Sequence, residues 1–258
     1  MTKWAIATAA ALILAGCQEP GTAEIARGNV LASRGQYDEA IASYRAAATA
    51  APKSARPLEL LGHLLMDRGR NAEARAAYQQ AIQVQPKDSL EARLGLAKLD
   101  ATEGKLDDAI GGLQAVLEQQ PGSLYALLSR AQLELKRARP GDVEQALQDT
   151  ALAMKVDQKN ASVLYTRGLA FLAAGQPDLA AEAFRLLEKA HPKSPLWAYG
   201  LAKVAMAKGD RPVALDLLRQ ARERAAPESG WSAAEVRKDP AFAPLKDDPA
   251  FAAALGEK

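Results

Sequence analysis

The chain has few of the residues that covalent or metal chemistry requires. Its 258 residues include one cysteine and two histidines, so an intrachain disulfide is excluded and a zinc site is not expected. Aromatic residues make up only 5% of the sequence, which argues against one large aromatic core and favours helices packed through small residues. The formal net charge of +2 is too small to indicate nucleic acid or an anionic surface as the main partner.

Sequence motifs of enzymatic chemistry are missing as well. The chain contains no glycine-rich phosphate loop, no HExxH and no GxSxG. His63 and His191 lie far apart in the sequence, and the carboxylates mostly alternate with Lys and Arg, as they do on solvated helix faces. We therefore expect a protein that is not an enzyme and has no cofactor, metal or small-molecule substrate.

A repeated pattern of small, aromatic and proline residues is the strongest signal in the sequence. Apolar residues such as Leu58, Leu61 and Leu65 are spaced three and four apart, which places them on one face of a helix. Gly69 then predicts a left-handed turn and Pro86 the end of a second helix. The following residues recur 34 positions later: Gly28, Gly35, Ala40, Tyr44 and Pro52 become Gly62, Gly69, Ala74, Tyr78 and Pro86.

A two-helix unit with a period of about 34 residues resembles the tetratricopeptide repeat. The resemblance implies an all-α solenoid of six helical hairpins, wound as a right-handed superhelix, over residues 22–226. The expected repeats are 22–52, 55–86, 90–121, 124–159, 161–192 and 195–226. The fourth is irregular, because the segment from Lys136 to Asp142 lengthens its turn by about three residues.

Residues 227–258 form a C-terminal segment of different composition. Ser232 with Glu235 is typical of a capping box, and Asp239 and Asp248 each stand before a proline, as at a helix start. A solenoid must cover the exposed face of its last repeat. We expect the following apolar residues to form this cap: Trp231, Phe242, Leu245, Phe251 and Leu255.

The first 16 residues predict an export signal. Lys3 precedes an apolar run, from Trp4 to Leu14, that is too short for a permanent membrane span. The sequence Leu14-Ala15-Gly16-Cys17 resembles the lipobox of bacterial lipoproteins, which implies that Cys17 is acylated, palmitate included, and begins the mature protein. The alternative is an ordinary secretory signal followed by a chance cysteine.

The residues after Cys17 carry two further expectations. Gln18 stands where inner-membrane lipoproteins typically carry Asp, so the resemblance points to the periplasmic face of the outer membrane in a host with two membranes. Residues 17–21 form a very short tether, which would hold the repeats close to the membrane.

The tetratricopeptide resemblance also implies which side chains line a concave groove. The implied set for partner binding is Asn29, Arg56, Glu59, His63, Leu94, Lys98, Tyr125, Leu128, Gln132, Tyr165, Leu169, Tyr199 and Lys203, with Ile25, Met66, Leu135, Leu172 and Met206 at further inward positions. The first half of this set is mixed and polar, and the second half is apolar with three tyrosines, a residue enriched at binding surfaces. The alternative is that the Leu and Met side chains only fill gaps between repeats.

The groove does not carry the set that clamps a terminal carboxylate in chaperone-binding relatives. Those proteins use Lys and Asn at fixed positions, whereas here Ile25 stands at the Lys position before Asn29. An amphipathic or extended hydrophobic segment is the expected ligand.

The combination of lipobox, short tether and six repeats resembles the pilotin lipoproteins of type IV pili, which include the transferable gliding-motility lipoproteins. In that family the lipoprotein helps secretin subunits to assemble in the outer membrane. The resemblance implies a secretin subunit as partner and a role in pilus-dependent motility. Two alternatives remain, an adaptor that docks peptidoglycan hydrolases and a lipoprotein of the tight-adherence pilus class.

Overall fold

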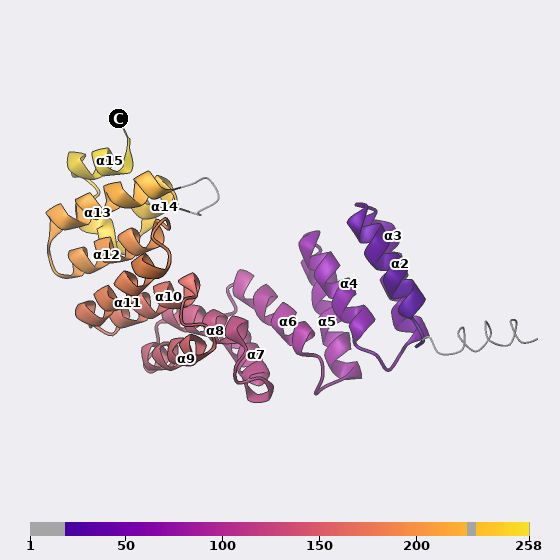
Figure 1. Cartoon of the computed structure of the whole chain (residues 1–258). Helices are drawn as coiled ribbons and strands as arrows, with labels where there is room; N and C mark the ends of the chain where they lie inside the picture. The colour runs from indigo at the N-terminus through magenta and orange to yellow at the C-terminus, as the bar shows by residue number, and fades with distance from the viewer. Residues whose placement is uncertain (1–18, 226–230, 258) are drawn as a thin grey trace, which may run out of the picture. The chain divides into compact units, whose positions relative to one another are not determined.

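The computed structural model describes residues 19–225 and 231–257 (Figure 1). Every regular element in these ranges is a helix, which confirms the predicted all-α fold. The export signal and Cys17 lie outside the described residues. The chain divides into two compact units between Val116 and Leu117, and each unit is described by itself below.

Helices of similar length follow one another through short turns. Six hairpins are formed by α2 (Thr22–Ser33) with α3 (Tyr37–Ala50), α4 (Arg56–Asp67) with α5 (Asn71–Val84), α6 (Leu90–Thr102) with α7 (Leu106–Gln119), α8 (Leu124–Arg137) with α9 (Asp142–Val156), α10 (Ala161–Ala173) with α11 (Pro177–Ala190), and α12 (Leu196–Ala207) with α13 (Arg211–Arg224). Three short helices follow: α14 (Ala233–Lys238), the 3₁₀ helix η2 (Pro240–Leu245) and α15 (Pro249–Leu255).

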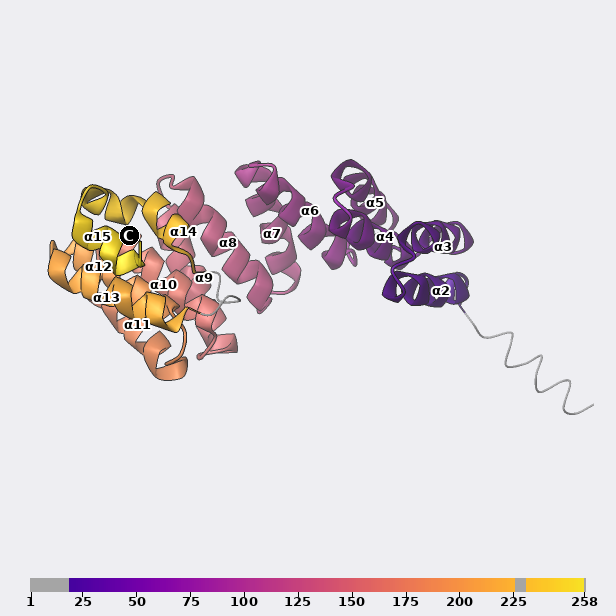
Figure 2. The same ribbon diagram turned by 90° about the horizontal axis from the view of Figure 1, so that it is seen from above.

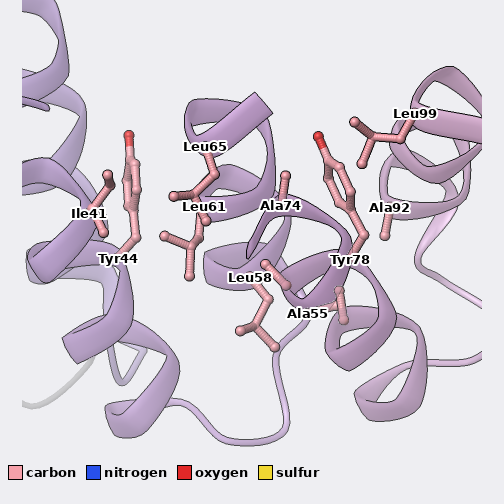
Figure 3. Packing of buried hydrophobic residues seen from close by; sticks show 12 residues of the cluster. Ile41, Tyr44, Ala55, Leu58, Leu61, Leu65, Ala74, Tyr78, Ala92 and Leu99 are labelled. Atoms are coloured by element: carbon pink, nitrogen blue, oxygen red, sulfur yellow. The ribbon is translucent and has the colours of Figure 1, made fainter. Parts of the chain in front are cut away.

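In the first unit, one aromatic ring fills the space between three helices. Tyr78 on α5 is fully buried, and a Cβ added at Gly62 on α4 or at Gly95 on α6 would lie 2.4 Å or 2.3 Å from its ring. The small residues therefore let the helices approach across the ring. Figure 3 shows Tyr44 of the first hairpin and Tyr78 of the second in the same orientation.

The second unit repeats this arrangement with phenylalanine. Phe184 on α11 is fully buried between α10 and α12, where a Cβ added at Gly168 or Gly200 would lie 2.5 Å or 2.3 Å from its ring. Close packing at native density leaves no room for these methyl groups. The aromatic and glycine positions of the sequence repeat therefore define the contact between successive hairpins.

The turn of the fourth hairpin departs from the others. Gly69 has φ of 71° in the second hairpin, and Ala138 has φ of 54° at the corresponding turn. Alanine is strained in this left-handed region because its Cβ crowds the backbone. The turn is closed by Asp142, whose carboxylate accepts hydrogen bonds from the Arg137 guanidinium at 2.9 Å and 2.5 Å and from the Arg139 N–H at 2.8 Å.

The fourth hairpin also contains a buried ionic cluster. Arg130 on α8 donates two hydrogen bonds to Asp149 on α9, at 2.7 Å and 2.6 Å. Glu134 lies one turn further along α8, 3.9 Å from the same guanidinium and 3% exposed. Burial, with Asp149 and Asp142 nearby, raises the pKa of Glu134 to about 7.

The last three helices pack on the sixth hairpin, as Figure 2 shows. The side chains of Ser232, Asp239 and Asp248 accept hydrogen bonds from the first turns of α14, η2 and α15, as the sequence predicts. Phe242 and Phe251 are fully buried, and their ring centroids lie 6.1 Å apart. The following residues complete this core: Ala202, Leu218, Val236, Leu245, Ala254 and Leu255.

Candidate functional site

Two of the predicted groove residues of the first unit, Asn29 and His63, hydrogen-bond to buried tyrosines. Tyr44 donates through its hydroxyl to Asn29 Oδ1 at 2.8 Å, and the Tyr78 hydroxyl lies 2.9 Å from His63 Nδ1. Each pair joins the two helices of one hairpin. Asn29 and His63 thus satisfy the polar end of an otherwise apolar ring, a role the sequence analysis did not assign to them.

Only some of the charged side chains predicted to line the groove of the first unit are available to a ligand. Burial lowers the pKa of His63 against the opposing effect of Glu91, 3.9 Å away, so the imidazole is neutral at pH 7. Glu59 is buried, and burial raises its pKa although the Arg56 guanidinium lies 3.7 Å away. Arg56 and Lys98 are exposed, and Leu94 is half-buried.

In the second unit, the predicted residues of α8 differ in exposure. Tyr125 is 51% exposed, and Leu128 is half-buried. Gln132 donates through Nε2 to Thr166 Oγ1 on α10 at 3.2 Å. This bond joins neighbouring hairpins, so Gln132 links the repeats while Tyr125 remains accessible.

Two predicted groove residues of α12 bind the chain's own C-terminal segment. The Tyr199 hydroxyl donates a hydrogen bond to Asp239 Oδ2, and Lys203 Nζ lies 2.6 Å from the same oxygen. Burial alone would raise the pKa of Asp239, but these two partners and the Ala241 N–H together hold it below its usual value. Tyr199 and Lys203 were expected to face a partner, and the structure instead turns both onto Asp239.

Tyr165 on α10 is the third tyrosine of the predicted groove. It is half-buried, and its ring centroid lies 5.7 Å from that of Phe184. Burial raises its pKa strongly, and the negative charge of Asp239 adds to this effect. Its ring therefore belongs to the packing between the two helices of the fifth hairpin.

A cavity of about 610 Å³ lies beside these residues, on the side of the second unit formed by α8, α10, α12 and η2. We call it the groove cavity. Its size is ordinary for a ligand pocket, and its one cation and one carboxylate neutralise each other. The residues that line it are Leu135, Leu169, Leu172, Ala173, Lys203, Met206, Ala207, Asp239, Pro240 and Ala241.

The sequence analysis identified half of this lining. Leu135, Leu169, Leu172, Lys203 and Met206 are inward positions of the repeat. The wall formed by Asp239, Pro240 and Ala241 was missed, because helix-start signals give no information on which helix the segment packs against.

Within residues 19–225 and 231–257, no cluster of His, Cys, Asp or Glu is arranged to hold a metal ion. In the same ranges no helix is long and apolar enough to cross a membrane.

Two family models match the sequence, and both are described as tetratricopeptide repeat. One matches residues 31–99 and 65–133, and the other matches residues 5–55 and 165–230. Together they cover well over half of the chain. No curated protein matches it.

Solved structures with the same fold share little sequence with this chain. A tetratricopeptide repeat protein from Parabacteroides merdae has 19% identity and a TM-score of 0.74, with 91% of this chain and 90% of that chain covered. PilW, a type IV pilus biogenesis factor, has 16% identity and a TM-score of 0.65, with 81% and 96% covered. PilF of Pseudomonas aeruginosa has 15% identity and a TM-score of 0.63, with 79% and 90% covered. At these identities the likeness establishes the fold alone.

Proposed function

The chain belongs to the tetratricopeptide-repeat family, and from this we propose that it is a lipid-anchored scaffold that binds an apolar segment of a protein partner. The observation that carries the proposal is the groove cavity, in which four large apolar side chains face a space without net charge. Leu135, Leu169, Leu172 and Met206 come from three successive hairpins. Such a surface suits the apolar face of a helix or an extended hydrophobic strand. Repeat proteins of this kind are typically interaction scaffolds rather than catalysts.

We propose a secretin subunit as the partner, and promotion of secretin assembly for type IV pili and pilus-dependent motility as the function. Two observations support it. The lipobox at Leu14–Cys17 is of the kind that leads to acylation of the cysteine and anchoring in the outer membrane. The fold is also shared with PilW, a type IV pilus biogenesis factor.

A second candidate is an adaptor lipoprotein that docks peptidoglycan hydrolases or serves a tight-adherence pilus. The same groove cavity and the same anchor support it, because repeat stacks present similar surfaces to different partners. The two candidates differ in the phenotype of a deletion. Loss of a secretin-assembly factor abolishes pili with cell shape intact, whereas loss of a hydrolase adaptor alters division or envelope integrity with pili present.

The first experiment is a gene deletion followed by blotting of membranes for the heat- and detergent-resistant secretin multimer. The proposal expects the multimer to disappear while monomer remains. A normal multimer in the outer membrane would overturn the secretin proposal and favour the hydrolase adaptor.

A second experiment tests whether the groove cavity is the binding site. Leu172→Asp places a charge among the apolar side chains of the cavity, so partner binding should fall by roughly tenfold or more. Leu186→Asp on α11 is the matched control, because Leu186 is 50% exposed and does not line the cavity. Equal circular dichroism spectra establish that both variants fold. Equal binding by the two variants would place the site elsewhere.

A further inference from the structure

A second cavity, of about 670 Å³, lies at the start of the first unit. We call it the edge cavity. Its lining combines two residues of the expected tether, Glu19 and Pro20, with the loop between α3 and α4. Ile25, Pro52 and Pro57 give it an apolar wall.

Charged side chains of both signs border the edge cavity. Lys53 and Arg56 supply two exposed cations; the Arg56 side chain is 58% exposed, and its guanidinium lies 3.7 Å from the Glu59 carboxylate. Glu19 supplies a carboxylate. Two cations, one anion and an apolar wall match a molecule with a phosphate, an ammonium and hydrocarbon, which is the composition of an ethanolamine phospholipid.

The position of the edge cavity along the chain brings it to a membrane. Only Gln18 separates Cys17 from Glu19, so their Cα atoms are at most about 7 Å apart. A lipid headgroup layer is roughly 5–7 Å thick. An acylated Cys17 with its chains in the hydrocarbon therefore holds Glu19, and the cavity that Glu19 lines, within or directly beside the headgroups.

We propose that the edge cavity binds the headgroup of a phosphatidylethanolamine molecule from the leaflet that holds the anchor. The phosphate lies beside Lys53 and Arg56, the ammonium beside Glu19, and the glycerol region against Ile25 and the prolines. This inference rests on the lipid anchor of the proposed function and is independent of which protein occupies the groove cavity. Headgroup binding would fix the orientation of the first unit on the membrane, which the acyl chains alone do not.

The test is hydrogen exchange of the full lipidated protein. It is reconstituted in vesicles of phosphatidylethanolamine and phosphatidylglycerol at 3:1 and compared with the protein in dodecyl maltoside, a detergent without phosphate. Peptides spanning residues 49–58 should exchange roughly tenfold more slowly in the vesicles. The double variant Lys53→Gln/Arg56→Gln should lose this protection, and Lys189→Gln/Lys193→Gln, which removes equal charge in the second unit, should keep it.

The outcomes of this experiment distinguish a failure of the proposed headgroup site from a failure of the proposed lipid anchor. Protein that floats with the vesicles without protection of residues 49–58 overturns the headgroup site and leaves the anchor intact. Protection that survives Lys53→Gln/Arg56→Gln also overturns it, because the cations would then not bind the phosphate. Protein that fails to float shows that Cys17 carries no anchor, which overturns the membrane part of the proposed function together with this site. Equal protection by 10 mM inorganic phosphate in detergent would show a free-phosphate site instead.

Discussion

The hydroxyl of Tyr199 donates a hydrogen bond to the carboxylate of Asp239, 40 residues further along the chain. Lys203, one turn after Tyr199 on α12, pairs with the same oxygen, and its Nζ lies 4.9 Å from the centroid of the Tyr199 ring. The three side chains hold the start of η2 on the inner helix of the sixth hairpin. This part of α12 is therefore covered by the chain itself, and Lys203 and Asp239 also line the groove cavity.

Asp239→Asn should lower the free energy of unfolding of the second unit by about 1–3 kcal/mol, because it leaves the mostly buried Lys203 ammonium without its counter-ion. Urea unfolding monitored by the fluorescence of Trp197 and Trp231 measures this loss. Asp247→Asn, at an exposed residue of the same segment, is the control and should be neutral. An Asp239→Asn variant as stable as the parent would show that apolar contacts alone hold the cap.

The contact of Asp239 with Tyr199 and Lys203 should make the free energy of unfolding depend on pH in a defined direction. Because the pKa of Asp239 is lower in the folded than in the unfolded chain, its contribution is present above the unfolded pKa of about 4 and is lost as the pH falls through the folded value. The stability difference between the parent and Asp239→Asn should therefore shrink in urea titrations from pH 5 towards pH 3. A difference that stays constant over this range would contradict the ion pair.

Gly200→Ala should destabilise the second unit by about 1–3 kcal/mol or more, because the added methyl group meets the ring of Phe184 at 2.3 Å. Gly111→Ala on α7 is the matched control. In the described structure a Cβ at Gly111 meets no atom within 4 Å apart from its chain neighbours and the backbone of its own helix, so this change should raise stability by about 0.5–1 kcal/mol through helix propensity. Urea unfolding followed by circular dichroism compares the two, and equal effects would show that the hairpins can move apart.

Glu134→Gln should stabilise the protein at pH 8 by roughly 1–3 kcal/mol and change little at pH 5. The pKa of Glu134 is raised to about 7, so between about pH 4.5 and 7 the folded state holds a proton that the unfolded state has released. The free energy of unfolding therefore falls as the pH rises through this window. Glu182→Gln, at an exposed residue of α11, is the control, and a pH-independent effect of Glu134→Gln would contradict the raised pKa.

Ala138→Gly should raise stability by about 0.5–1 kcal/mol, because glycine adopts φ of 54° without the crowding that alanine suffers. Ala174→Gly is a matched comparison at the end of α10, where φ is −75° and alanine is unstrained. It should lower stability. Thermal unfolding by circular dichroism distinguishes the two directions, and a destabilised Ala138→Gly would show that Arg137 and Asp142 already compensate for the strain.

The helices and their contacts could be predicted from local patterns. Gly62 and Tyr78 stand at a spacing that recurs in the first and fifth hairpins, and in these three hairpins the aromatic ring is buried against the glycine, so sequence position alone places the pair together. Asp239 could be recognised as a helix start because an Asp directly before a proline is also a local pattern. Its contact with Tyr199 could not be predicted, because it depends on how the cap folds back over 40 residues.

The polar part of the site was harder to predict than the apolar part. Leu169 and Leu172 follow from the inward positions of the repeat, and the structure places both in the groove cavity. His63 and Asn29 occupy such positions too, but their hydrogen bonds go to Tyr78 and Tyr44. A polar residue at an inward position has two possible partners, a ligand or the nearest buried hydroxyl, and the sequence alone does not distinguish them.

The two tyrosines of the first unit differ in the glycines packed against their rings. The ring of Tyr78 is packed against Gly62 and Gly95, whereas among the glycines that the structure describes Tyr44 has only Gly28, of its own hairpin, against its ring. Tension between an anchored Cys17 and a bound partner would extend α2 and α3 first, while Tyr78 stays packed between Gly62 and Gly95. The first hairpin would then serve as an extensible spacer and add reach under load to the short tether that the sequence predicts.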